Sequence, residues 1–413
     1  MRAMPHASMT TASGLTVLAA RHPGVEGMAI SVAVRCGMVD ERPGEAGYAH
    51  LLEHLVHQHT GAPGAARLEQ AIHAVGGISN AQTYPFHTEY SLHVPLFPSS
   101  TQEISQWITG SLGRLTWPRL PRGAIGAEQL IVEREVDLGV NGRPLGGFPW
   151  RHLLGTISRE FGFAHDGFGD LNDVRSATVT SLRSFFSRHY HPSKAAISIV
   201  TDRDPDEILE TFDRTAESRS ASTVPKALPV TSAVLEINRT DPLFSGWVRA
   251  ESRLLSGTGN PTVDRAAALV ACRVASLLDP TVRWQGGLFG PELGPDHDLV
   301  VSIGSGRGKA GLLTTPTPQP DSPDYSALVQ RGTRDVLDAL DRHQSSPATY
   351  SAMLTRDALW GFPPGATRAA VAATSPAAVS DLLGLISATA PGCLTVCGTA
   401  PVEPQRAATS VPA

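Results

Sequence analysis

The feature that most constrains this chain is the stretch His50-Leu51-Leu52-Glu53-His54. A helix advances about 100° per residue, so His50 and His54 would lie one above the other with Glu53 beside them. Two neutral imidazoles can occupy two corners of a zinc tetrahedron. Glu53 is too close along the chain to share that ion comfortably and is left to act as a base on water at the metal. The spacing predicts a metal-binding helix. The alternative, in a chain with 15 histidines, is a chance cluster on a solvated helix.

A third ligand is expected from a separate element, and residues 127–136 offer carboxylates at helical spacing. Glu128 and Glu135 are seven residues apart and share a helix face, whereas Glu133 points almost the opposite way. Glu128 and Glu135 can therefore both face one site.

The regions around the motif are similar to a known family. The apolar run Met28–Val34 predicts a strand, and residues 44–47 supply a turn into the metal helix. Together with residues 36–41 and 47–54, this order resembles the strand, turn and zinc helix of a peptidase family. The family is that of pitrilysin, insulysin and the mitochondrial processing peptidase. Its His-x-x-Glu-His order is the inverzincin signature. Later landmarks of the family are matched by residues 76–83 running on to 88–90, by 167–170 and by 189–194.

The resemblance implies a role for each residue of the motif. His50, His54 and Glu135 would be the ligands of one zinc ion per chain, Glu53 the general base and Glu128 the supporting carboxylate. The interval from His54 to Glu135 is slightly longer than is usual in the family. We place the extra residues in the Gly- and Pro-rich stretch 117–126, which is a loop by composition.

The same resemblance implies an edge strand at residues 78–93 that takes up the substrate backbone, with Asn80, Ala81 and Thr83 as substrate-binding residues. His87 and His93 are expected to border the cleft without binding metal. The implied activity is that of a zinc-dependent endopeptidase acting on unfolded peptides or trimming a leader or precursor peptide. An inactive structural partner and a non-proteolytic metal hydrolase are the alternatives.

The length of 413 residues predicts two domains, because it exceeds what one hydrophobic core usually supports. Residues 215–232 are poor in large apolar side chains, contain two prolines and read as a linker. We therefore expect a zinc-binding domain at 1–214, a second domain at 233–398 and a disordered tail at 399–413. The resemblance implies an α+β fold of two homologous units, each an antiparallel sheet with helices packed on one face.

The second half has no second His-x-x-Glu-His, so only the first half is expected to bind metal. In two-chain relatives a homologous partner presents an Arg/Tyr pair to the substrate. By the same resemblance, Gly290 and His297 stand at the positions of that pair in this chain. The resemblance thus implies the catalytic subunit of a heterodimer whose partner lacks the zinc motif.

Charge and composition exclude other classes. A net charge of −5 and a pI near 6.3, with no basic face along the chain, argue against nucleic-acid binding. We see no membrane span and no secretory or transit signal in residues 1–13, so a cytoplasmic location is expected. Other conspicuous groups have simpler interpretations. We expect His57 and His59 to be surface or supporting residues. We expect Cys393 and Cys397 to be small apolar residues of a strand, and residues 304–309 to be a flexible loop.

Overall fold

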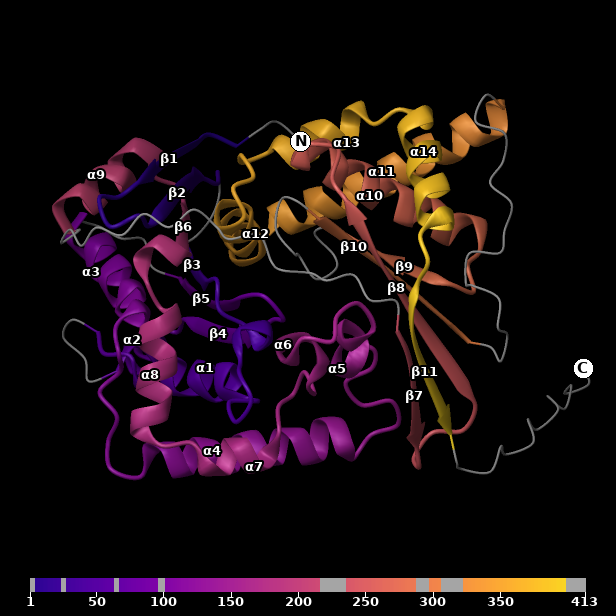
Figure 1. The fold of residues 1–413 in the computed structure, drawn as a ribbon. Coiled ribbons are helices and arrows are strands. Elements are labelled where there is room, and N and C mark those ends of the chain that lie inside the picture. The colour runs from indigo at the N-terminus through magenta and orange to yellow at the C-terminus, as the bar shows by residue number, and fades with distance from the viewer. Residues whose placement is uncertain are drawn as a thin grey trace, which may run out of the picture.

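The computed structural model describes residues 4–23, 27–62, 67–95, 101–215, 235–286, 297–305 and 322–398. Within them the chain forms two sheets, one from each half of the sequence (Figure 1). The first sheet has the strand order β1-β2-β6-β3-β5-β4, and the second has the order β7-β11-β8-β10-β9. The strands of the first sheet are β1 His6–Thr10, β2 Thr16–Arg21, β3 Met28–Val34, β4 Ile78–Thr83, β5 Thr88–Val94 and β6 Ala195–Thr201. Those of the second are β7 Glu236–Asp241, β8 Trp247–Ser256, β9 Arg283–Gln285, β10 His297–Ser305 and β11 Gly392–Gly398.

The helices fill the long connections between these strands. In the first half they are α1 Tyr48–His59, α2 Leu68–Ala74, α3 Thr101–Leu112, α4 Ala124–Glu135, α5 Trp150–Leu153, α6 Phe161–Ala164, α7 Leu171–Ser176, α8 Val179–His189 and α9 Pro205–Thr215. In the second half they are α10 Pro261–Leu278, α11 Pro323–Ser345, α12 Pro347–Leu359, α13 Ala366–Ala373 and α14 Pro376–Ala388. Short turns include η1 Met38–Asp40, η2 Gly113–Leu115, the π-type turn η3 Val136–Asn141, η4 Leu154–Thr156 and η5 Pro192–Lys194.

The predicted α+β class with two sheet-and-helix units is confirmed. Neighbouring strands are antiparallel except for β2–β6 in the first sheet and β7–β11 in the second, which are parallel. Each parallel pair joins the first and last parts of its half, and such pairs need a long crossover rather than a tight hairpin. Most of the predicted linker 215–232 and the whole tail 399–413 lie outside the described residues.

Each sheet is covered on one face by helices of its own half. In the first sheet α1, α3 and α9 lie on that face, and every residue of the central strands β3 and β6 is buried. The opposite face is covered by α12, which comes from the second half and contacts β2, β3, β5 and β6 (Figure 1). Hydroxyl groups connect the two: Ser198 of β6 hydrogen-bonds to Ser351 and Thr355 of α12 at 2.6–2.8 Å. The expected arrangement of helices on one face is therefore extended by a helix from the other half.

The second sheet receives the reciprocal contact. Helix α5 and the turn η4, both from the first half, pack against β11, and η4 also contacts β7. Leu153 and Leu154 of this segment share an apolar core with Ala250, Val301 and Leu394 of the second sheet. The two halves thus interlock.

Among the described helices none alone is long and apolar enough to cross a membrane. Helices α13 and α14 meet that criterion only as a pair, across a bend of 99°.

Candidate metal centre

Helix α1 is fixed at its first turn by the buried carboxyl group of Glu41. Gly47 adopts a φ of 96°, a left-handed conformation that favours glycine, and the helix begins at the next residue. Glu41 accepts hydrogen bonds from the backbone N–H of Gly47 at 2.9 Å and of Ala49 at 2.7 Å. Such a carboxyl group satisfies N–H groups that a helix start leaves unpaired. The apolar face of α1 is buried in the first core through Leu51, Leu52 and Leu55. The histidines of the motif are therefore held on a rigid helix.

Three predicted ligands meet at one point. The Nε2 atoms of His50 and His54 are 3.2 Å apart. Oε2 of Glu135, at the end of α4, lies 3.3 Å from Nε2 of His50 and 3.5 Å from Nε2 of His54. The hydrogen bond with His50 lowers the pKa of Glu135, so its carboxylate is held ionised. Two imidazoles and one anionic oxygen thus face a common centre.

These distances fit a zinc ion. Zinc binds nitrogen and carboxylate oxygen at about 2.0–2.2 Å, so tetrahedral geometry separates two such ligand atoms by about 3.3–3.6 Å. The three observed separations, from 3.2 to 3.5 Å, are close to this range. Three protein ligands leave a fourth position open, which is the pattern of a catalytic rather than a structural zinc site.

Glu128 contacts the ring nitrogen of His54 that does not face the other two ligands. This buried carboxylate lies about two helical turns before Glu135 on α4, and its Oε2 is 3.3 Å from Nδ1 of His54. Burial acts to lower the pKa of His54, but the hydrogen bond with Glu128 and the charges of Glu53 and Glu135 raise it overall. A carboxylate on the second ring nitrogen orients a metal-binding histidine and fixes its tautomer.

Glu53 lies beside the ligands on the same helix and is 7% exposed. Thr83 donates a hydrogen bond to its Oε2 at 3.0 Å from the end of β4. Burial raises the pKa of Glu53, although His50, His54 and the Thr83 hydroxyl act in the opposite direction. A carboxylate with a raised pKa is better matched to proton transfer near neutral pH.

Glu133 points away from this centre. Its carboxylate accepts a hydrogen bond at 3.0 Å from Nε of Arg175, on α7. The helical phase that separated Glu133 from Glu135 in the sequence is thus present in the structure. The stretch 117–126 is a loop only as far as Gly123, because α4 begins at Ala124. A left-handed φ of 83° at Gly123 marks that boundary.

Strand β4 forms one edge of the first sheet and pairs only with β5 among the described strands. Asn80, Ala81 and Thr83 all lie on it and line the cavity in front of the metal centre. The predicted single edge strand 78–93 is wrong in extent: it is a hairpin, with β5 inside the sheet. His87 is accordingly buried, stacked on Tyr84 at 4.5 Å, and does not border the cavity. His93 lies on β5 and is absent from the cavity lining.

The cavity has a volume of about 1060 Å³ and is lined by both halves of the chain. His343, Met353 and Arg356, from α11 and α12, form its wall on the second-half side. Arg356 Nε lies 3.7 Å from Oε2 of Glu89 on β5. These second-half residues were not identified from the sequence. Gly290 lies outside the described residues, and the side chain of His297, at the start of β10, is not described.

Nearby histidines have other partners. His57 Nδ1 lies 3.5 Å from Glu69 Oε1, and burial lowers the pKa of His57 to about 4. His59 Nε2 lies 3.7 Å from Glu128 Oε1. Neither belongs to the three-ligand cluster. Cys393 and Cys397 are unbridged residues of β11.

The chain thus combines two sheet-and-helix units with a candidate zinc site on a helix of the first unit. Residues 16–109 match the family described as Insulinase (Peptidase family M16). The match covers less than a quarter of the chain, and over it the chain is similar to that family.

Relatives share limited identity with the chain. An uncharacterized zinc protease of Mycobacterium leprae is 28% identical over 203 residues, which are 48% of this chain and 43% of that protein. Zinc protease PqqE of Helicobacter pylori is 24% identical over 214 residues, 52% of this chain and 47% of that protein. A probable mitochondrial-processing peptidase subunit beta of Schizosaccharomyces pombe is 24% identical over 215 residues, 51% and 45% of the two chains. The matched stretch spans about half the length of these curated relatives.

Solved structures extend the similarity of fold to the whole chain. A protease from Helicobacter pylori superposes with a TM-score of 0.74 at 15% identity, covering 95% of this chain and 99% of that one. A putative M16-like peptidase from Alicyclobacillus acidocaldarius gives a TM-score of 0.71 at 16% identity, covering 97% and 99%.

Proposed function

We propose that this chain is a zinc-dependent endopeptidase that hydrolyses extended peptides, including leader or precursor segments. The observation that carries the proposal is the set of three ligand atoms at 3.2–3.5 Å, contributed by His50, His54 and Glu135. Glu53 lies beside them, and an open sheet edge borders the same cavity. A chance histidine cluster would have no reason to combine these features.

The chain's own residues supply most of the proposed mechanism. When bound, zinc would act as a Lewis acid that polarises the scissile carbonyl and makes water more acidic. Glu53 accepts the proton from the attacking water and delivers it to the nitrogen of the leaving amine. Thr83 orients the Glu53 carboxylate through its hydrogen bond, and Glu128 holds the ring of His54. The bond broken is the peptide C–N bond, and water supplies the new C–O bond.

Substrate binding is proposed at β4. A peptide added along this free edge would be held by main-chain hydrogen bonds, so sequence preference would come from side-chain pockets. The cavity walls from the first and second halves would confine the substrate to an extended segment. Unfolded peptides fit this arrangement better than folded proteins.

The metal dependence tests the proposal. The purified chain should cleave members of a library of unstructured peptides, lose cleavage after dialysis against a zinc chelator, and regain it with zinc added back. Cleavage that survives complete removal of metal would exclude the zinc mechanism. A chain that binds zinc but cleaves no peptide, alone or with a homologous partner, would favour the inactive structural role.

The proposal includes a two-chain enzyme in which this chain is the catalytic subunit. Support comes from the relative named as a processing-peptidase subunit and from the lack of a second metal motif in this sequence. We expect weak activity from the chain alone and a gain on adding a homologous partner that lacks the zinc motif and carries an Arg/Tyr pair. A lost oxyanion donor typically costs about 10²- to 10³-fold in rate. Full activity of a monomer or homodimer, unchanged by such a partner, would contradict this part of the proposal.

A further inference from the structure

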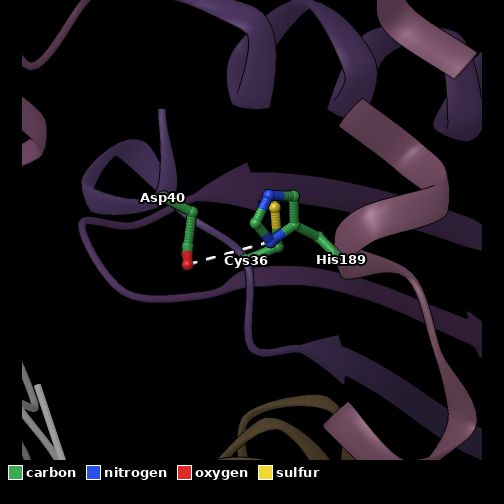
Figure 2. Close-up of side chains that lie close together, drawn as sticks. All are labelled: Cys36, Asp40 and His189. Carbon is green, nitrogen blue, oxygen red and sulfur yellow. Dashed lines mark ion pairs between the residues drawn. The ribbon is translucent and has the colours of Figure 1, made fainter. Parts of the chain in front are cut away.

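A second cluster of metal-binding side chains lies away from the His50/His54/Glu135 centre (Figure 2). Cys36 follows β3, Asp40 ends the turn η1, and His189 is the last residue of α8. The Cys36 sulfur, a carboxylate oxygen of Asp40 and a ring nitrogen of His189 all lie within 4.8 Å of one another. Segments far apart in the sequence thus bring three different ligand types to one point.

The ring nitrogens of His189 have no hydrogen-bond partner. The ring packs on Phe185 with centroids 4.7 Å apart, but both nitrogens are buried and make no hydrogen bond with the part of the chain that the structure describes. The nearest acceptor atom, Oδ1 of Asp40, is 3.8 Å from Nδ1, beyond hydrogen-bonding distance. Buried polar atoms in folded proteins are almost always paired, so the ring nitrogens of His189 have capacity left for a water, a ligand or an ion.

The other two side chains are prepared for the same ion. Asp40 is oriented by the backbone N–H of Gly37, which donates to its Oδ2 at 3.0 Å and leaves Oδ1 facing His189. Cys36 is fully buried, unbridged and directed into the cluster (Figure 2). Sulfur, imidazole nitrogen and carboxylate oxygen are together the donor set of zinc and its close neighbours among the transition metals.

We propose that Cys36, Asp40 and His189 form a second binding site for a divalent transition-metal ion, with zinc as the best match and one coordination position left for water. Tetrahedral zinc separates such ligand atoms by about 3.3–3.6 Å. The His189–Asp40 pair is already at 3.8 Å, and because all three atoms lie within 4.8 Å of one another, the remaining closure is at most about 1.5 Å. Small side-chain rotations cover that distance.

The surroundings of the cluster determine the protonation states of its ligands and the charge that a bound ion would balance. Burial, together with the positive charges of Lys194, Arg188 and Arg42, lowers the pKa of His189 to about 3, so the imidazole is neutral with a lone pair available. Arg188 is itself paired with Glu45 at 2.7 Å. Binding ionises the Cys36 thiol and releases its proton, so that one thiolate and the Asp40 carboxylate balance the 2+ charge.

The site would tie three elements together. It joins the end of β3 to the end of α8 and fixes the turn η1, whose next residue, Glu41, caps α1. Its occupant would therefore stabilise the position of the helix that carries His50 and His54 without touching substrate.

Cobalt replacement separates the two sites, because only the second contains sulfur. The full chain, freed of metal and loaded with Co²⁺, should bind two ions and show a thiolate-to-cobalt charge-transfer band in the near ultraviolet. His50→Ala/His54→Ala should keep one ion and the band. Cys36→Ser and His189→Gln should each lose one ion, and Cys36→Ser should also lose the band. The matched control Cys272→Ser, a buried cysteine of α10, should keep both.

A parent protein with one ion and no thiolate band overturns the proposal, whatever the variants do, and so does a band that persists in folded Cys36→Ser. If Cys36→Ser does not fold, the parent stoichiometry and folded His189→Gln decide. None of these measurements uses peptidase activity, so failure of the proposed function would not be confused with failure of this site.

Discussion

Glu53 is the residue on which the proposed chemistry depends most directly, because it is the carboxylate beside the ligands that does not join them. Glu53→Gln keeps the shape of the side chain and its hydrogen-bonding partner Thr83 but removes the base. We expect zinc content to be unchanged and kcat/KM to fall by about 10²- to 10⁴-fold. Metal analysis and peptide hydrolysis on the same preparation measure both quantities.

Glu133→Gln is the matched control for that substitution, because Glu133 is paired with Arg175 away from the cavity. It should retain parental activity. Parental activity in Glu53→Gln would show that another group transfers the proton.

Glu135 and Glu133 differ by half a turn of α4, and this difference predicts different metal binding. Glu135→Ala removes an anionic ligand atom 3.3 Å from His50, whereas Glu133→Ala removes only the pair with Arg175. Zinc occupancy after dialysis should fall strongly in the first variant and little in the second. Similar losses, or a larger loss at Glu133, would refute the ligand assignment.

Glu41 predicts a pH dependence of stability. Burial raises its pKa from an ordinary value of 4.5 to about 8, although hydrogen bonds from Gly47 and Ala49 act to lower it. Between these two pH values the folded chain binds more protons at Glu41 than the unfolded chain, so this group makes the free energy of unfolding fall as pH rises. In Glu41→Gln that contribution is absent, and denaturant titrations at about pH 5 and about pH 8 should differ less than in the parent. An unchanged difference would mean that Glu41 is not the group responsible.

For single residues, the sequence predicts the site well where the residues lie on the same helix. The positions of His50, Glu53 and His54 on one turn, and of Glu128 and Glu135 on one face, follow from helical phase alone. Their geometry matches the predicted arrangement. His343, Met353 and Arg356 could not be found in the same way, because only tertiary packing brings α11 and α12 to the cavity.

Among the elements, β4 is the one with an unused edge. If a substrate adds to it as an antiparallel strand, only alternate backbone N–H groups of the peptide point toward β4. Peptides N-methylated at single positions should therefore show raised KM at every second position near the cleavage site and little change between them. An effect with no two-residue alternation would argue against strand addition.

Strand pairing shows where sequence patterns stop being informative. The apolar run of β3 and its place before the metal helix were predictable, because both are contiguous in sequence. The hairpin β4–β5 was read as one strand, since the turn at residues 84–87 separates two segments of similar character. The parallel neighbours β2–β6 depend on contacts between residues 180 positions apart, such as Thr16 and Ala196, which no local pattern encodes.

For the whole molecule, the division into two halves at residues 215–232 remains a prediction from composition. The apolar cores do not follow that division. One core combines Leu18 and Val200 of the first sheet with Leu354 of α12, and another combines Leu153 with Leu394 of the second sheet. The cavity is built the same way, with Glu89 and Arg356 facing each other from different halves. Opening the cavity widely would require some of these shared contacts to break.

Helix α12 of the second half covers a face of the first sheet, and α5 and η4 of the first half pack against the second sheet. Each half therefore covers part of the sheet of the other. A chain cut between residues 215 and 235 should give two fragments that are individually aggregation-prone, each with a bare sheet face, yet assemble into a soluble complex when produced together. By the same reasoning the intact chain should melt in one calorimetric transition rather than two. Independently soluble fragments, or two resolved transitions, would show that the halves are autonomous. In folding, then, a sequence that reads as two units is expected to act as one.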